Sequence, residues 1–213
     1  MTSPKYLLSF FFLASLTACE PSITFTEPQP AATDNLSEIP RRVQGRYLSL
    51  KDSSILLVSP SLISRIYDFN YKVHISKAES GMQKSGDTLI DPKTNEKQLI
   101  VDGGDSLLRN AHYVDTLFML GSGEHVLKKF KGYYFLNKRH AAESWEVRKM
   151  EQTRGKLIIS SLSEEKDLAS LKEITESRED TAAPYHFTAT QQQFKEFVKS
   201  NGFHDNETFV RQR

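Results

Sequence analysis

The sequence predicts an α+β fold, made mainly of antiparallel β-strands in a barrel-like or sandwich-like sheet, with one or two C-terminal helices. Three observations support this prediction. Short segments rich in β-branched and aromatic residues fill the chain from residue 43 to about 160. Glycine, asparagine and aspartate turn signals separate these segments. After residue 163 the apolar residues change to a helical period.

The expected strands follow one another closely, as in a series of hairpins. Within residues 69–75 apolar and polar side chains alternate, so Phe69, Tyr71, Val73 and Ile75 should lie on one face that packs on the core. Residues 117–120 and 133–136 are apolar without alternation, which predicts a central pair covered on both faces. The expected strands are 43–50, 54–58, 69–77, 97–102, 113–120, 125–130, 133–138, 144–150 and 156–160.

Two helices are expected in the last part of the chain, from about 163 to 213. Apolar residues at 168, 171 and 174 recur at helical spacing behind an acidic first turn, which Ser163 precedes as an N-cap. Thr190 and Gln193 form a capping-box pattern, which predicts a second helix from about Gln191 to Ser200. Asn201 and Gly202 follow as its stop signal.

The N-terminus carries a dense apolar run behind one positive charge. Lys5 precedes the run from Tyr6 to Leu16, which includes three consecutive phenylalanines. A positive segment followed by about 7–15 apolar residues is typical of a secretory signal. A membrane-spanning helix needs about 20 apolar residues, and the stretch after Ala18 does not supply them. Residues 1–18 are therefore predicted to be a signal peptide.

The residues that end this run are Leu16, Thr17, Ala18 and Cys19. They resemble the lipobox of bacterial lipoproteins, in which an aliphatic residue, a small or hydroxylated residue and Gly, Ala or Ser precede a cysteine. The resemblance implies cleavage before Cys19 and attachment of acyl chains to its sulfur and amino group. Because two or three chains give stable membrane attachment, the protein should stay in the bacterial cell envelope. In a Gram-negative cell the outer membrane is the favoured location.

Residues 19–40 are predicted to form a flexible tether after the lipidated cysteine. Pro21, Pro28, Pro30 and Pro40 interrupt this segment, and it has neither a helical nor a strand period. A short strand around Phe25, docked onto the body, is the alternative. The rest, 41–213, is predicted to be a single β-rich domain, since a chain of 213 residues usually forms one compact unit.

The charge balance bears on the partners. Loss of residues 1–18 removes Lys5 and no acid, so 27 basic side chains would face 27 acidic ones. A neutral chain lacks the concentrated basic face with which proteins grip nucleic acid. The sequence therefore predicts a membrane partner through the lipid on Cys19 and an envelope protein as a further partner, with no nucleic acid.

Catalytic, metal and cofactor sites have little support in the sequence. No two of the six histidines lie two to four residues apart, as metal ligands on one element usually do. Asp102-Gly103-Gly104-Asp105 lacks the further oxygen ligands of a calcium loop and is better explained as a turn. Ser163 and Lys166 match the S-x-x-K pattern of penicillin-binding proteins, but S-D-N and K-T-G elements are missing. We therefore assign no catalytic residue, metal or cofactor.

Two functions remain open. The first is a non-catalytic structural or interaction module held at the membrane through Cys19. The second follows from Gly45-x-Tyr47, which resembles the opening G-x-W motif of lipocalins and implies a β-barrel that carries a small apolar ligand. A third, weaker hypothesis is a hydrolase whose catalytic residues form no recognisable sequence motif.

Overall fold

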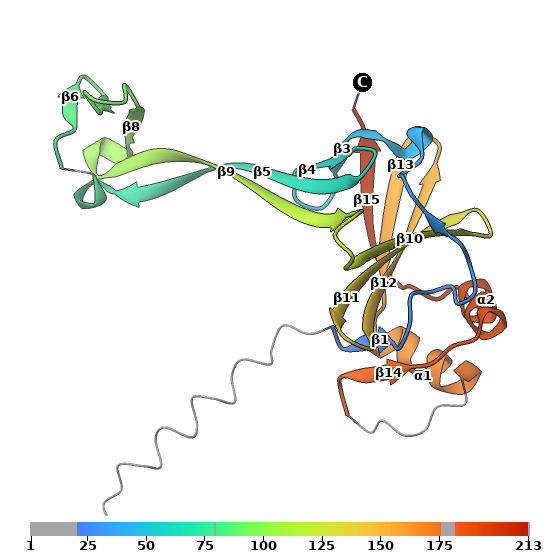
Figure 1. Ribbon diagram of the computed structural model, residues 1–213. Coiled ribbons are helices and arrows are strands. Elements are labelled where there is room, and N and C mark those ends of the chain that lie inside the picture. The colour runs from blue at the N-terminus through green and yellow to red at the C-terminus, as the bar shows by residue number, and fades with distance from the viewer. Residues whose placement is uncertain (1–20, 79, 176–181, 213) are drawn as a thin grey trace, which may run out of the picture.

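The computed structural model describes residues 21–78, 80–175 and 182–212 of the chain. It confirms a predominantly antiparallel β fold with two α-helices in the described residues (Figure 1). The predicted signal peptide and the lipobox cysteine lie outside the described residues. The 3₁₀ turns are Arg41–Val43, Ile75–Lys77 and Asp102–Gly104. The strands and helices are β1 Ile23–Phe25, β2 Asn35–Leu36, β3 Gly45–Ser49, β4 Ile55–Val58, β5 Leu62–His74, β6 Gln83–Ser85, β7 Thr88–Ile90, β8 Lys97–Val101, β9 Ser106–Met119, β10 His125–Phe130, β11 Tyr133–Ala141, β12 Ser144–Thr153, β13 Lys156–Ser161, α1 Glu164–Thr175, β14 Tyr185–Phe187, α2 Gln191–Lys199 and β15 Asp205–Arg211.

The strands form one sheet, ordered β2-β10-β11-β12-β13-β15-β3-β4-β5-β9-β8-β7-β6, with β1 and β14 attached beside β12. In the body the sheet curves around a core to which distant strands contribute Tyr47, Phe118, Leu127, Tyr134 and Phe209. The sheet is open, because the two ends of the strand order, β2 and β6, do not pair. The body is therefore a curved sheet with an opening between β9 and β11, and not a closed barrel.

A second core covers the opposite face of β11 and β12. Phe135 and Val147 on these strands pack against Phe194 and Phe197 of α2 and against Leu171 of α1. Residues 134–136 are buried on both faces, which confirms the predicted covering of the strand at 133–136. The stretch 117–120 differs: it ends β9 beside the opening, and Met119 is exposed, because β9 is not a central strand there.

Both predicted helices form. The Thr190 hydroxyl accepts from the Gln193 backbone at 3.2 Å, and the Gln193 side chain accepts from the Thr190 backbone at 3.0 Å, which confirms the capping box. In α1 the buried Asp167 accepts hydrogen bonds from the backbone of Ser163, at 2.7 Å, and of Phe203, at 3.0 Å. This carboxylate joins the start of α1 to the segment that leads into β15.

The prediction of a flexible tether over 19–40 is wrong for the part that the structure describes. Ile23 and Phe25 are buried in β1, which pairs with β12 and β14. Farther along, the buried Lys128 amine donates to the carbonyls of Pro28 and Pro30, at 2.9 Å each. The prolines fix the path of a docked segment, and buried polar side chains of β10 and β11 satisfy its backbone.

A long ribbon leaves the body. β5 and β9, of 13 and 14 residues, pair along their lengths. Beyond the body the described residues give them one further strand neighbour, β8, which belongs to a small outer sheet of β6, β7 and β8 (Figure 1). The outer sheet has its own small core around Leu89, Ile100 and Leu107. We call residues 64–74 with 106–116 the arm.

Candidate functional site

One face of the arm is aromatic. Tyr67 lies opposite Tyr113, and Phe69 lies opposite Ala111. The Tyr67 and Tyr113 ring centres are 6.0 Å apart, and those of Phe69 and Tyr71 are 6.1 Å apart. These side chains share a face because they occupy alternate positions of paired strands.

This aromatic face is open to solvent. Phe69 is 54%, Tyr71 40% and Tyr113 58% exposed. The predicted alternation is confirmed over residues 69–73, whereas Ile75 begins a 3₁₀ turn after the strand. The prediction that Phe69 and Tyr71 face the core is wrong, because the strand has left the body at that point. A two-stranded ribbon is marginally stable alone in water, and a contiguous exposed apolar surface marks an interaction site.

The other face of the arm is more polar. His112 Nδ1 and Asp68 Oδ1 lie 2.6 Å apart on opposing residues, and both side chains are exposed. Val114 is 49% exposed on the same face. The two faces therefore differ in character.

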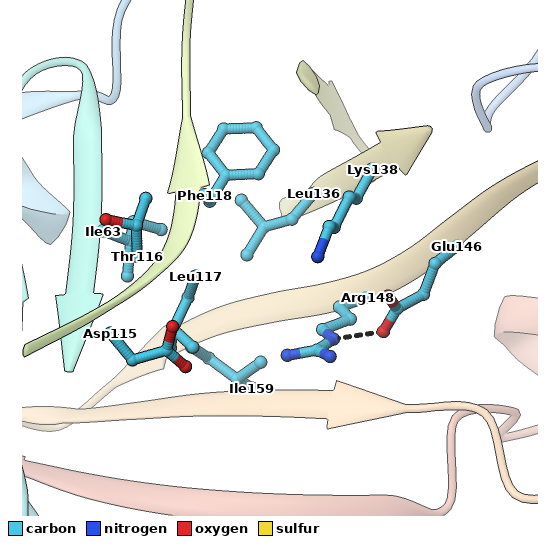
Figure 2. Close-up of a pocket in the computed structure, with 10 residues that line it drawn as sticks. All are labelled: Ile63, Asp115, Thr116, Leu117, Phe118, Leu136, Lys138, Glu146, Arg148 and Ile159. Carbon is cyan, nitrogen blue, oxygen red and sulfur yellow. Dashed lines mark hydrogen bonds and ion pairs between the residues drawn. The ribbon is translucent and has the colours of Figure 1, made fainter. Parts of the chain in front are cut away.

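The aromatic face continues into a pocket at the base of the arm (Figure 2). The pocket has a volume of about 150 Å³ and spans the opening between β9 and the strands β11 to β13. Its apolar floor and charged rim are Ile63, Leu117, Phe118, Leu136, Ile159, Asp115, Thr116, Lys138, Glu146 and Arg148.

The charges of the rim are partly paired. Arg148 Nε donates to Glu146 Oε1 at 2.6 Å, and His140 Nε2 lies 3.0 Å from the other carboxylate oxygen. Burial raises the pKa of Glu146, but the charges and hydrogen bonds of Arg148 and His140 outweigh it, so the pKa lies below its ordinary value. Glu146 is therefore an anion at neutral pH and a poor proton donor.

The outer edge of β9 is unpaired along most of the arm. β8 pairs with β9 at residues 106–108, and from residue 109 onward β9 has β5 as its single neighbour in the described sheet. An unpaired edge presents a row of backbone donors and acceptors. In β9 this row passes beside the pocket.

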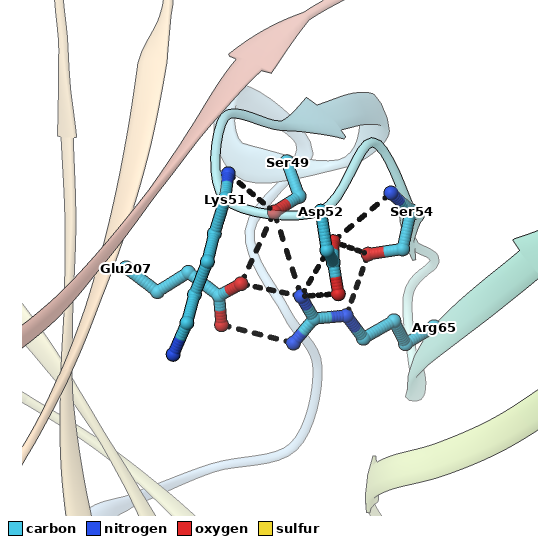
Figure 3. A network of polar contacts seen from close by, with 6 residues as sticks. All are labelled: Ser49, Lys51, Asp52, Ser54, Arg65 and Glu207. Atoms are coloured by element: carbon cyan, nitrogen blue, oxygen red, sulfur yellow. Dashed lines mark hydrogen bonds and ion pairs between the residues drawn. The ribbon is translucent and has the colours of Figure 1, made fainter.

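Arg65 anchors the arm to the body (Figure 3). Its guanidinium contacts Glu207 of β15 and lies 3.0 Å from the carboxylate of Asp52, in the turn between β3 and β4. Its Nε donates to the Ser54 hydroxyl at 2.7 Å. Burial raises the pKa of Asp52, but hydrogen bonds from Ser54, Ser49 and Arg65 hold it well below its ordinary range. This network is a structural joint, since each polar group has a partner.

The residues considered in the sequence as catalytic or metal-ligand candidates do not lie close to one another in the structure. Ser163 precedes α1 and donates its backbone N–H to Asp167, so its place is that of a helix cap. Asp102 pairs with Lys72 at 2.8 Å on the exposed surface of the arm. In the described residues no group of three or more His, Cys, Asp or Glu side chains is placed to hold a metal ion.

Gly45 and Tyr47, which carry the lipocalin resemblance, begin β3. Tyr47 is fully buried, and its hydroxyl donates to the Val43 carbonyl at 2.8 Å, so the ring fills the core of the body. Trp145 is buried as well. These aromatic rings are core side chains.

Sequence reasoning missed the pocket, the free edge and the exposure of the aromatic face. The pocket joins residues of β9 and β12 that become neighbours only through the curvature of the sheet. A signal was present for the arm, because residues 62–74 contain no glycine or proline, as a single long strand requires.

No protein family, curated protein or solved structure matches this chain. Among the residues that the structure describes, neither helix has the length and apolar character needed to cross a bilayer.

Proposed function

We propose that the protein is a lipid-anchored interaction module of the bacterial cell envelope, without catalytic activity, that presents its arm to a partner protein. The observation that carries the proposal is the arm itself, a projecting ribbon with an exposed aromatic face. The cost of ordering such a ribbon is offset when a partner covers it.

The anchor is the lipidated Cys19. Ile23 begins β1 four residues after Cys19, which allows at most about 14 Å of extended chain between the lipid and the folded body. The docked N-terminal segment therefore supports a body held close to the membrane at the β1 end. In Figure 1 the arm leaves from the region of β3 and β4, at the far end of the body from β1. The arm is thus free to meet a protein away from the headgroups.

The alternative of a carrier for an apolar ligand has weaker support. The interior of the curved sheet is filled by its own side chains, and the pocket of about 150 Å³ is smaller than the 300–1,000 Å³ usual for small-molecule sites. A hydrolase is not favoured either, since Glu146 is held as an anion and no described hydrogen bond joins the Thr116 hydroxyl to a base.

Photo-crosslinking in intact cells tests the interaction role. A photoreactive phenylalanine analogue at Phe69 should capture one discrete protein of the envelope. The matched control is the same analogue at Leu50, which is 61% exposed on the body and should capture nothing. Equal capture from both positions, or capture from neither, would contradict the proposal.

Fractionation tests the anchor separately. Wild-type protein should remain with membranes after a high-salt wash and should have lost its signal peptide, whereas Cys19→Ser should carry no acyl chain and keep its signal peptide. Intact mass of the membrane-extracted protein should show the added acyl chains. A Cys19→Ser variant cleaved at the same site as the wild type, or wild-type protein without acyl chains, would rule out lipidation as the anchor.

A further inference from the structure

We propose that the free edge of β9 binds an extended peptide segment of the partner by strand addition, and that an apolar side chain of this segment fills the pocket. This inference rests on the proposed interaction role and names the chemistry of the partner. Strand addition derives affinity from backbone hydrogen bonds and specificity from pockets for alternate side chains. β9 offers both features at one place.

The backbone of β9 supplies the first feature. From residue 109 to residue 116 the strand is extended, paired with β5 on one side and open on the other. A seven- or eight-residue edge is long enough for a strand of ordinary length. No proline interrupts it, and the described bulge lies just beyond it, where Ile63 and Ser64 of β5 pair with Phe118 and Thr116 and leave Leu117 of β9 as the extra residue. An added strand would continue the curved sheet beyond β9, beside the pocket.

The pocket supplies the second feature. It lies on the inner face of the sheet, and Asp115, Thr116, Leu117 and Phe118 of β9 form one of its walls. A cavity of about 150 Å³ with an apolar floor has room for a group the size of a benzene ring. An inward-facing side chain of an added strand would enter it, because side chains of paired strands point to the same face. The pocket therefore selects a large aliphatic or aromatic side chain.

The aromatic face favours a second apolar side chain in the bound peptide. Tyr113 lies two positions beyond Asp115 of the pocket wall, on the same inward face of β9. A peptide residue about four positions from the pocket residue would lie over Tyr113, where an apolar side chain covers the exposed ring. The expected ligand is an extended segment with two large apolar side chains about four residues apart.

A second copy of this chain fits the edge less well. Antiparallel pairing of two β9 strands centred on Tyr113 would place Arg109 of the second copy opposite Leu117, and pairing centred on Val114 would place Ala111 there. The guanidinium would meet an apolar floor and two cations of the rim, and the methyl group would leave the pocket unfilled. The structure therefore favours a different protein as the source of the strand.

A displayed library of random 12-residue peptides, selected on the mature full chain, tests the proposal. Selected peptides should share two large apolar residues about four apart. A synthesised peptide should slow amide hydrogen exchange at residues 109–116 of β9 and leave exchange in α2 unchanged. Replacement of its pocket residue by alanine should weaken binding at least tenfold.

Two variants of the protein locate the binding. Leu117→Lys places a charge in the pocket and should weaken peptide binding at least tenfold. Val114→Lys places the same charge on the outer face of the same strand and should change binding less than twofold. If Leu117→Lys lowers the thermal stability of the chain, the alanine variant of the peptide, bound to the wild-type chain, decides the result.

Several outcomes would overturn the inference. These are the absence of any selected peptide, binding that protects a surface other than β9, and a dimer in which β9 becomes protected without peptide. Capture of a protein from Phe69 without protection of the β9 edge would sink strand addition and leave the interaction role standing. If position 69 captures no protein but a peptide still binds at the β9 edge, strand addition would stand and the proposed interaction role would fall.

Discussion

Arg65 holds the carboxylate of Glu207 in β15 and that of Asp52 in the turn between β3 and β4, and it lies over two aromatic rings. Its guanidinium is 5.3 Å from the Tyr67 ring centre and 5.5 Å from that of Phe209. The Arg65 side chain is 12% exposed, and removing it would leave the partly solvated carboxylates of Glu207 and Asp52 without the cation that lies between them. This side chain therefore couples the arm to the body.

The variant Arg65→Ala should lower the free energy of unfolding by about 2 kcal/mol, a value reduced for the partial solvation of both carboxylates. Lys72→Ala is the control, because its ion pair with Asp102 is about half exposed and should contribute far less to the free energy of unfolding. Urea denaturation measures both changes. Equal losses in the two variants would contradict the role given to Arg65.

His125 gives the fold a pH dependence. Its ring lies edge-on to Phe118 with centres 5.0 Å apart, and Nε2 is buried without a hydrogen-bond partner among the described residues. Burial, with a smaller contribution from the charge of Lys138, lowers the pKa of His125 from 6.5. The unfolded chain therefore binds a proton at a higher pH than the folded chain does.

Stability should consequently be complete above pH 6.5 and fall as the pH drops below that value toward the lowered folded pKa. The variant His125→Phe should remove this part of the pH dependence, whereas Ser122→Ala, which leaves the ring buried, should retain it. Thermal unfolding between pH 5 and pH 8 is the measurement. An unchanged slope in His125→Phe would show that the dependence has another source.

At the scale of elements, the N-terminal segment is part of the sheet domain because polar side chains of β10 and β11 form hydrogen bonds with its backbone. The Asn137 amide accepts from the Gln29 N–H at 2.6 Å and donates to the Gln29 carbonyl at 2.9 Å. Together with Lys128 this amide fixes residues 28–30 against β10 and β11. A buried amine with two carbonyl acceptors holds the segment more firmly than apolar contacts alone would.

The variant Lys128→Met should free this segment, because the carbonyls of Pro28 and Pro30 would lose their donor inside the fold. Limited proteolysis should then cut between residues 27 and 36 at least tenfold faster. Lys129→Met is the matched control, since the neighbouring side chain is exposed and should leave the rate unchanged. A Lys128→Met chain cut as slowly as the wild type would show that the two carbonyls do not depend on this amine.

The elements also show how far sequence reasoning reached. Most strands and both helices were predicted, since short apolar segments between turn signals, and the Thr190 capping box, are local patterns. Residues 62–68 were missed as the first half of β5, because polar and apolar side chains mix where one strand crosses from core to solvent. The alternative of a short docked strand around Phe25 is confirmed by β1. The docking of residues 28–36 was missed, because it depends on Lys128 and Asn137, about a hundred residues away.

At the scale of the whole molecule, the proposed membrane attachment at the β1 end and the proposed partner binding by the arm lie far apart. Chain length between Cys19 and Ile23 limits how far the β1 end can stand from a bilayer, and residues 67–74 of β5 alone extend the arm by about 25 Å. The candidate site could not be predicted from sequence, because curvature of the sheet brings β9 and β12 together. The alternation of residues 69–75 identified the aromatic face but did not reveal that it is exposed.

The most direct test of the account is hydroxyl-radical footprinting of the arm in native membranes and in the purified protein. We expect Phe69, Tyr71 and Tyr113 to be oxidised at least fivefold more slowly in membranes, because a partner covers them there. Leu50, exposed on the body, should react equally in both samples. Equal oxidation of the three arm residues in both samples would contradict an arm that holds a partner.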